Sequence, residues 1–190
     1  PIPTSVLAEF SKLKILQAPN FRDFRQAFRA KLGRNFIVPD NSFDNVKGQF
    51  PIGFFIWDTN QKEVFEETTT TIYDSKGEEL GNKLISSYLN DTNVIVWLRQ
   101  YYDKQGESIG FLRMNGTNIQ NNLGIYITSK LSDNDIHNHF YAEITKTNIL
   151  PMCIYLSIRE TVNANWINDR DQYLVPSSKW EDDKEFQYNC

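Results

Sequence analysis

The sequence predicts an α/β segment over residues 1–60, followed by a mixed, β-rich extension over residues 61–190. Three observations support this division. Residues 20–33 place apolar side chains at helical spacing. Residues 50–58 are a nearly continuous apolar run, which is typical of a strand buried on both faces. After residue 60 the chain becomes rich in Asn and Thr, with frequent turn signals.

The clearest expected helix covers residues 20–33, NFRDFRQAFRAKLG. Asn20 is placed to cap its start and Gly33 to end it. Its apolar face is expected to contain Phe21, Phe24, Ala27, Phe28 and Leu32. The arginines that should point away from this face are Arg22, Arg25 and Arg29.

Two strands are expected after this helix. Residues 36–39 (FIVP) predict a short strand that ends at Pro39, and residues 50–58 (FPIGFFIWD) predict the buried strand. A polar loop over residues 40–49 joins them. The apolar segment before the helix, residues 5–16, is compatible with either a helix or a strand.

The extension contains further candidate strands and several ambiguous segments. Strands are expected within residues 63–74, 107–116 and 121–131, separated by turn signals. Periodicity alone does not separate helix from strand for residues 93–102, 139–145 and 152–162.

Charge is unevenly distributed along the chain. The net charge is −4, yet the first 34 residues carry seven basic side chains against two acidic ones. Such a basic end is compatible with phosphate contact at one face and equally with a solvated helix face. Two cysteines, Cys153 and Cys190, indicate no disulfide scaffold and favour a cytoplasmic location. The apolar run over residues 149–158 is too short to span a bilayer, so we expect no membrane partner.

The two ends suggest a piece of a longer protein. The chain begins with Pro1 instead of Met and stops inside the aromatic-rich stretch KEFQYNC. A natural C-terminus is more often polar and mobile. Ordinary processing is the alternative explanation for the N-terminus.

One pattern resembles a metal site. His137, His139 and Glu143 have the H-x-H-x-x-x-E spacing of cupin barrels, and on a strand both imidazoles would face the same way. The glycines that usually frame that motif are replaced by Leu131 and Leu150, and the chain has no other histidine. We therefore expect a histidine pair at a loop edge and no metal ligands.

Residues 5–59 carry a broader resemblance. They contain FSKLKIL and the continuous stretch NFRDFRQAFRAKLGRNFIVPDNSFDNVKGQFPIGFFIWDT. This sequence resembles the C-terminal part of the methylase domain in gamma-class N6-adenine DNA methyltransferases of bacterial restriction–modification systems. Residues 160–187, ETVNANWINDRDQYLVPSSKWEDDKEFQ, resemble a segment found further along in the same proteins.

The resemblance implies a fold and a base-binding residue. The fold is the terminal part of a Rossmann-like sheet that ends in an antiparallel hairpin. Residues 20–33 would be the last covering helix, residues 36–39 the sixth strand and residues 50–58 the inserted seventh. In this family an aromatic side chain in the intervening loop packs on the flipped target adenine, and Phe43 matches that position. In the same loop, Lys47 could pair with a phosphate, and Gly48 would let the backbone approach DNA closely.

Further DNA contacts are expected in the extension, at Trp166, Asn168, Arg170 and Gln172. On a strand these four side chains would project from one face, because they are spaced by two. The alternative is that Trp166 anchors the core and Arg170 pairs with Asp169 or Asp171. As DNA contacts we rank Lys47 first, Arg170 second and the helix arginines last.

The catalytic motifs of the family are missing from this chain. The family binds S-adenosylmethionine through a Gly-containing loop and an acidic residue, and it positions adenine with (Asn/Asp/Ser)-Pro-Pro-(Tyr/Phe/Trp). Neither motif occurs in these 190 residues. The parent protein would use S-adenosylmethionine and bind DNA, whereas this chain alone should bind no cofactor and transfer no methyl group. The alternative is a free-standing β-rich binding or interaction module without enzymatic activity.

Overall fold

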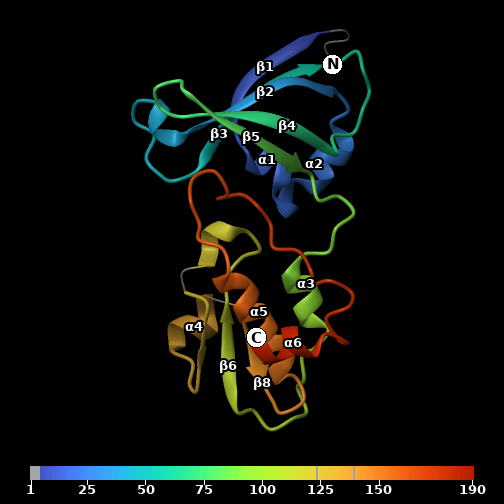
Figure 1. The fold of residues 1–190 in the computed structure, drawn as a ribbon, viewed down its shortest axis with the longest axis vertical. Coiled ribbons are helices and arrows are strands. Elements are labelled where there is room, and N and C mark those ends of the chain that lie inside the picture. Colours follow the sequence, from blue (N-terminus) through green and yellow to red (C-terminus); the bar gives the residue numbers. More distant parts are fainter. Residues whose placement is uncertain (1–4, 123, 139) are drawn as a thin grey trace. The chain divides into compact units, whose positions relative to one another are not determined.

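A computed structural model describes residues 5–122, 124–138 and 140–190. The chain divides into two compact units, each with its own open sheet, and the fold is mixed α/β with more strand than helix (Figure 1). Unit 1 comprises the chain up to Asn90 together with a returning segment, Asn165–Asp171. Unit 2 comprises Asp91–Ala164 and Gln172–Cys190.

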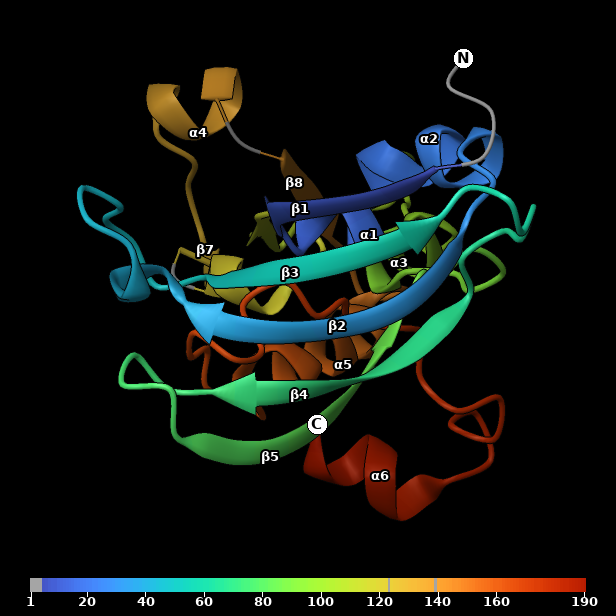
Figure 2. The same cartoon turned by 90° about the horizontal axis from the view of Figure 1, so that it is seen from above.

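Unit 1 is a five-stranded sheet with the order β1-β3-β2-β4-β5, as Figure 2 shows. Its strands are β1 (Val6–Lys12), β2 (Lys31–Pro39), β3 (Pro51–Asp58), β4 (Glu67–Tyr73) and β5 (Glu79–Ser86). Two short helices, α1 (Lys14–Gln17) and α2 (Arg22–Ala27), connect β1 to β2 along one face of the sheet. Single 3-10 turns occur at Pro19–Phe21 and Asp40–Ser42.

Strand β3 lies between β1 and β2 and is antiparallel to both. Strands β1 and β2 therefore run in the same direction, and β4 is parallel to β2. The carboxyl ends of β1, β2 and β4 consequently lie on the same side of the sheet, which we call its carboxyl edge. The loop over residues 40–50 and the turn between β4 and β5 both lie at this edge (Figure 2).

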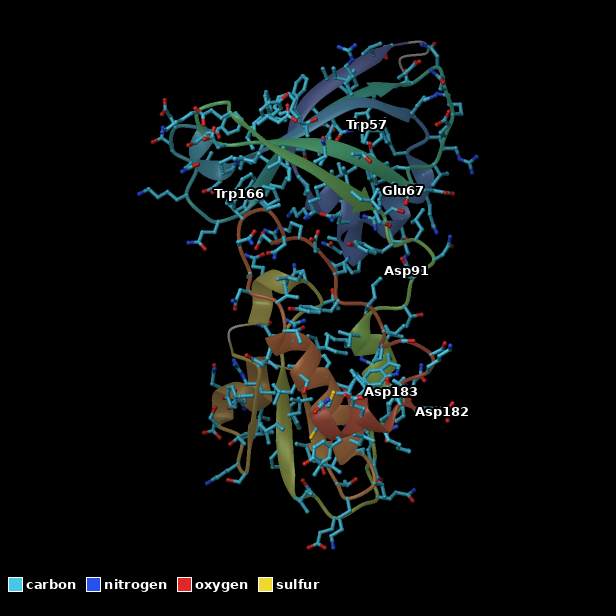
Figure 3. All side chains as sticks on the ribbon, in the orientation of Figure 1. Trp57, Glu67, Asp91, Trp166, Asp182 and Asp183 are labelled. Atoms are coloured by element: carbon cyan, nitrogen blue, oxygen red, sulfur yellow. The ribbon has the colours of Figure 1, made fainter. Side chains whose placement is uncertain are left out.

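The core of unit 1 lies between the sheet and its helices. Phe55 and Trp57 of β3 are buried there, and Figure 3 labels Trp57. Gly53 makes room for the ring of Phe55, because a β-carbon on Gly53 would stand 2.1 Å from a ring atom of Phe55. The other buried members of this cluster are Leu13, Leu16, Ala30, Ile37, Phe65, Ile72 and Ile85.

The expected strand over residues 50–58 is confirmed by β3, and the expected end of the preceding strand at Pro39 is confirmed by β2. The helix expected over residues 20–33 is wrong in extent, because α2 ends at Ala27 and β2 already begins at Lys31. Residues from Lys31 onward pair with β3, with a register shift between Leu32 and Asn35. Main-chain pairing across the sheet therefore overrides the local helical pattern.

The arginines of this region also differ from expectation. Arg25 is buried and donates to the carbonyls of Ile15, Ala18 and Ser87, at 2.9–3.1 Å. It holds the turn between α1 and α2 against the end of the sheet. Burial and the nearby charge of Arg22 lower its pKa. Arg22 and Arg29 remain exposed, as expected.

The sheet does not end at residue 60, where the sequence suggested that the α/β segment stops. Strands β4 and β5 extend the same hydrogen-bonded ladder, so the first unit continues to Asn90. Parallel pairing of β4 with β2 joins residues that are distant in sequence, such as Phe36 and Thr71. No local pattern at residue 60 reveals this pairing.

Unit 2 has a three-stranded antiparallel sheet in the order β7-β6-β8. Its strands are β6 (Gly110–Met114), β7 (Tyr126–Thr128) and β8 (Phe140–Ile144), and its helices are α3 (Val94–Arg99), α4 (Asp133–Asn138), α5 (Ile149–Glu160) and α6 (Lys184–Asn189). A 3-10 turn covers Ile119–Asn122. The core brings together Leu98, Leu112, Met114, Met152, Ile154 and Tyr155. No helix in the described ranges is long and apolar enough to cross a membrane.

The ambiguous segments of unit 2 are decided by capping and packing. Within residues 93–102 the segment Val94–Arg99 becomes helix α3, whose start is capped because the side chain of Asn93 accepts hydrogen bonds from the main-chain N–H groups of Ile95 and Val96. Helix α5 occupies most of the run from Ile149, where Tyr155 and Met152 pack in the core. The strand expected over residues 121–131 is limited to β7.

Unit 2 contains an ordered polar turn around Asp103. Its carboxylate accepts from Thr147 Oγ1 at 2.7 Å and from the main-chain N–H groups of Gln105 and Gly106 at 2.9 and 3.0 Å. These hydrogen bonds, led by the one from Thr147, lower the pKa of Asp103 to about 2. Because the ionised form is the one that is bound, this turn requires a charged Asp103.

We expect unit 2 to lose part of its stability as the pH falls from about 4 to about 2. A carboxyl group whose pKa is depressed by folding contributes stability above its unfolded pKa, and this contribution disappears as the pH falls through the folded value. Asp103→Asn should therefore show a flatter decline than the parent in this window, whereas the exposed control Glu107→Gln should follow the parent. Thermal unfolding measured at several acidic pH values checks this, and identical slopes for parent and Asp103→Asn would contradict it.

Candidate nucleic-acid interface

The loop between β2 and β3 is closed by its own backbone. The N–H of Asp40 donates to the carbonyl of Phe50 at 3.2 Å, which brings the two ends of the loop together. The N–H of Phe43 donates to the carbonyl of Asp40, also at 3.2 Å. Asn45 adopts a positive φ of 64°, a conformation that Asn tolerates better than most residues. These features shape a compact loop at the carboxyl edge of the sheet.

Phe43 is half-buried and sits at the head of this loop. Its ring meets the ring of Phe10, on β1, edge to face, with 5.1 Å between centroids. The sequence pattern did not point to Phe10, because its segment was equally compatible with helix and strand. A neighbouring ring limits the positions that Phe43 can take, so its remaining exposed surface is held in a defined place.

Phe43 is the first of five rings that cross the open face of the sheet. We call Phe43, Phe10, Phe54, Phe36 and Tyr73 the aromatic series. Successive centroids are 5.1, 4.8, 5.2 and 5.8 Å apart. The rings come in turn from the loop and from β1, β3, β2 and β4. They lie opposite the helix-covered face, since Phe54 alternates with the buried Phe55.

Gly48 has a structural role in this loop. A β-carbon at Gly48 would stand 2.3 Å from a ring atom of Phe50, so only glycine lets that ring pack against the loop backbone. The Nζ of Lys12 lies 4.3 Å from the centroid of the same ring, in a cation–π contact. Gly48 thus supports Phe50, and Lys12 adds a cation at the carboxyl end of β1.

Lys47 is exposed, at the same edge as Phe43. Its loop also contains the exposed Asp44 and the buried Asp40, so the loop itself is not basic. The loop therefore offers an anchored, half-exposed ring, a lysine able to meet an anion and a second cation at Lys12. This combination suits a planar group that carries a phosphate.

Residues 166–172 do not form the single strand on which Trp166, Asn168, Arg170 and Gln172 would share one face. Trp166–Arg170 form turns, in which Asn165 Oδ1 accepts from the N–H groups of Ile167 and Asn168 at 2.9 and 3.2 Å. Short polar side chains here satisfy the backbone locally and compete with strand pairing. Gln172 belongs to unit 2, where it pairs in an isolated bridge with Asn118, whereas Trp166, Asn168 and Arg170 belong to unit 1. The four side chains therefore do not share one strand face.

The returning segment is tied to unit 1 by side chains. Trp166, labelled in Figure 3, and Ile167 pack partly buried against the core of unit 1. Arg170 Nε lies 3.0 Å from Asp169 Oδ2, which is the pairing considered as the alternative to a DNA contact. Burial raises the pKa of Asp169, while the positive charges of Arg170 and Lys12 act in the opposite direction.

Asp171 completes this attachment. Its carboxylate accepts from Gln17 Nε2 at 2.9 Å and pairs with Lys83 Nζ at 2.8 Å. Lys83 Nζ also donates to the carbonyl of Ile167 at 2.6 Å. The segment is thus held to α1 and β5 of unit 1 by hydrogen bonds and an ion pair.

The possible metal motif is only partly described. His137 lies in α4 and Glu143 in β8, while His139 lies outside the described residues. Within the ranges that the structure describes, no group of three or more His, Cys, Asp or Glu side chains is arranged to hold a metal ion.

No protein-family model, curated protein or solved structure matches this chain.

Proposed function

We propose that this chain is part of a bacterial N6-adenine DNA methyltransferase of a restriction–modification system, in which it supplies the loop that stacks on the extruded target adenine. The observation that carries this proposal is the half-exposed ring of Phe43, braced by Phe10 in a closed loop between two antiparallel strands. An enzyme that modifies a base inside a duplex must extrude it and hold it by stacking.

The strand order supports the same proposal. The resemblance implies a Rossmann-like sheet whose last strand is inserted, antiparallel, beside the preceding one. In unit 1, β3 takes this place between β1 and β2. The base-stacking loop of such a sheet follows its sixth strand, and the loop that carries Phe43 follows β2 at the carboxyl edge.

The methyl donor is assigned to the parent protein and not to this chain. The Gly-containing donor loop and the (Asn/Asp/Ser)-Pro-Pro-aromatic motif are absent from the sequence, so the residues present do not fit S-adenosylmethionine. We assign no step of methyl transfer to these residues. Their role in the proposal is to hold the base and to contact phosphate through Lys47, with Arg170 as the weaker candidate because it pairs with Asp169.

Phe43→Ala should weaken binding to DNA that presents an extrahelical adenine by about tenfold, because stacking of a base on an aromatic ring contributes about 1–3 kcal/mol. The measurement uses duplexes with 2-aminopurine at the target position, either opposite an abasic site or fully paired. Fluorescence reports stacking of the probe base, and a titration gives the affinity. Binding of the fully paired duplex should change much less.

Phe24→Ala is a suitable control for this experiment. Phe24 is an exposed phenylalanine of the same unit, but it belongs to α2 on the helix-covered face. The Phe24→Ala variant should bind both duplexes with the affinity of the parent, and Phe43→Trp should retain stacking. Equal affinities of parent and Phe43→Ala for the abasic duplex would refute the proposal.

In the same assay Lys47→Ala should reduce the salt dependence of binding by about one counterion if Lys47 meets a phosphate.

A second candidate, an interaction module without enzymatic activity, is supported by a different observation. Strand β1 presents exposed apolar side chains at the border of the sheet and, among the described residues, pairs with a strand on one side only. This feature does not involve DNA, although Phe10 of the same strand also contacts Phe43.

A further inference from the structure

Unit 2 contains a pocket with a volume of about 310 Å³, which we call the α5–α6 pocket. It lies between α5 and the segment that leads into α6, and all of its lining residues belong to unit 2. Its volume is at the lower end of the range for small-molecule sites, about 300–1,000 Å³. A ligand about the size of one amino acid therefore fits it better than a peptide. Six apolar side chains form most of its wall: Ile158, Leu174, Val175, Pro176, Trp180 and Phe186.

The aromatic wall of this pocket is held in place by the core of unit 2. The ring of Trp180 meets the rings of Trp97 and Tyr101 edge to face, with 5.7 and 6.1 Å between centroids. Ile158 and Phe186 also pack, partly buried, against the core. An apolar ligand would therefore meet a preformed surface, which reduces the entropy cost of binding.

Two opposite charges, Lys179 and Asp183, line the same pocket. The main-chain N–H of Asp183 donates to the carbonyl of Lys179 at 3.1 Å, so the two residues stand one turn apart. Within the described part of the chain, no ion pair involves either side chain. The carboxylate of Asp183 accepts one hydrogen bond, from the main-chain N–H of Phe186 at 2.9 Å. Both side chains are exposed, so each can bind a charged group of a ligand.

We propose that the α5–α6 pocket binds a small zwitterion with an apolar body, of the class of the free apolar α-amino acids. The ammonium group of the ligand pairs with Asp183 and its carboxylate pairs with Lys179, which fixes its orientation. Its side chain lies on the apolar wall, where Leu174 and Val175 are 36% and 38% exposed. The ligand thus removes from water an apolar surface that is open in the free protein.

A ligand with a single charge fits this pocket less well. Residues 179–185 carry four acidic side chains against two lysines, so an anion without an ammonium group is repelled. A cation without a carboxylate would leave Lys179 unpaired and close to a like charge. This inference is independent of the proposed function, because Phe43 and Lys47 belong to unit 1.

Titration of the 190-residue chain with L-phenylalanine, followed by ¹H–¹⁵N NMR, tests this proposal. Signals of residues 174–186 should shift in a saturable manner, while signals of unit 1 should not change. Phenethylamine lacks the carboxylate and 3-phenylpropionate lacks the ammonium group. Each should bind about fivefold more weakly than L-phenylalanine, because each loses one exposed ion pair.

Asp183→Asn should weaken binding of L-phenylalanine about fivefold and remove its advantage over 3-phenylpropionate. The helix should persist, because Asp183 is the N-cap of α6 and asparagine caps a helix as well as aspartate does. Lys179→Gln should remove the advantage of L-phenylalanine over phenethylamine. The matched control is Asp182→Asn, which changes a neighbouring exposed carboxylate that does not line the pocket and should bind like the parent (Figure 3).

The dispersion of the NMR signals verifies that each variant is folded. The absence of saturable shifts with L-phenylalanine would overturn the proposal, and so would equally tight binding of either singly charged analogue. Equal losses in Asp182→Asn and Asp183→Asn, or shifts confined to other parts of the chain, would place the ligand elsewhere and would also overturn it. None of these outcomes affects the test of Phe43, which uses DNA binding.

Discussion

Arg159→Ala should lower the free energy of unfolding of unit 2 by about 3–5 kcal/mol, because three partly buried carbonyl groups would lose a charged donor that is itself buried. Arg159 lies in α5 and is fully buried. Its guanidinium donates to the carbonyls of Asn115, Gly116 and Asn118 at 3.2–3.3 Å. It thereby fixes the loop after β6 to the central helix of the unit.

The aromatic surroundings of Arg159 add to this effect. Its guanidinium lies 4.5 Å from the ring centroid of Tyr173 and 5.9 Å from that of Tyr155. Burial lowers the pKa of Arg159, yet an arginine stays charged at neutral pH. The same burial raises the pKa of Tyr155 to about 12, so this phenol stays neutral. The cation is therefore held by carbonyls and rings.

Urea unfolding combined with hydrogen exchange of peptides from each unit checks this prediction. Arg159→Lys should recover only part of the loss, since one ammonium group lacks the planar fork that reaches three carbonyls. Arg99→Ala removes an exposed arginine of α3 and should change stability by no more than about 0.5 kcal/mol. If Arg159→Ala were as mild as Arg99→Ala, the buried guanidinium would not stabilise the loop.

Phe55→Ala should lower the free energy of unfolding of unit 1 by about 3–5 kcal/mol, the usual cost of removing a phenylalanine ring from a core. Phe55 is fully buried in β3, the strand that joins β1 to β2. Its ring lies against Gly53 on one side, and its centroid is 6.4 Å from that of Trp57. Because Gly53 has no side chain of its own, truncation of Phe55 would leave a cavity beside it.

This variant also tests how far unit 1 extends. Because β1 to β5 form one hydrogen-bonded ladder, faster exchange should reach β4 and β5, beyond residue 60, while peptides of unit 2 keep their protection. Phe55→Leu should cost less than Phe55→Ala, because it leaves a smaller cavity. Phe54→Ala, on the open face, should cost less as well. Protection of β4 and β5 that stays unchanged in Phe55→Ala would contradict a single cooperative sheet.

Local patterns predicted several elements of this chain correctly. The unalternating apolar run over residues 50–58 predicted the strand that became β3. The expected burial on both faces holds only in part, because Phe54, Ile56 and Asp58 on the open face are partly exposed. Pro39 predicted the end of β2, because proline cannot donate to a ladder. The polar loop between these strands was also predicted, so the location of Phe43 in a loop followed from the sequence.

The candidate site itself depended on contacts that no local pattern contains. Phe10 becomes a neighbour of Phe43, and Phe54, Phe36 and Tyr73 join them in the aromatic series, only through the order of the strands. Gly48 was interpreted as a place where DNA could approach, but the ring of Phe50 occupies the space beside it. Likewise, spacing by two would place four side chains on one face only if Trp166–Gln172 were a strand, and local hydrogen bonds of Asn165 produced turns there instead.

The sequence by itself determined which segments are apolar, where the polar loop and Pro39 interrupt them, and that residues 50–58 lie inside a sheet. Only the tertiary structure decided that residues 31–35 are strand, that Arg25 is buried and that Asn165–Asp171 return to unit 1. Each of these outcomes depends on a partner distant along the chain: β3 for residues 31–35, Ser87 for Arg25, and Lys83 for Asp171. Periodicity reports the environment that a side chain prefers, whereas pairing across long sequence distances decides which preference is satisfied.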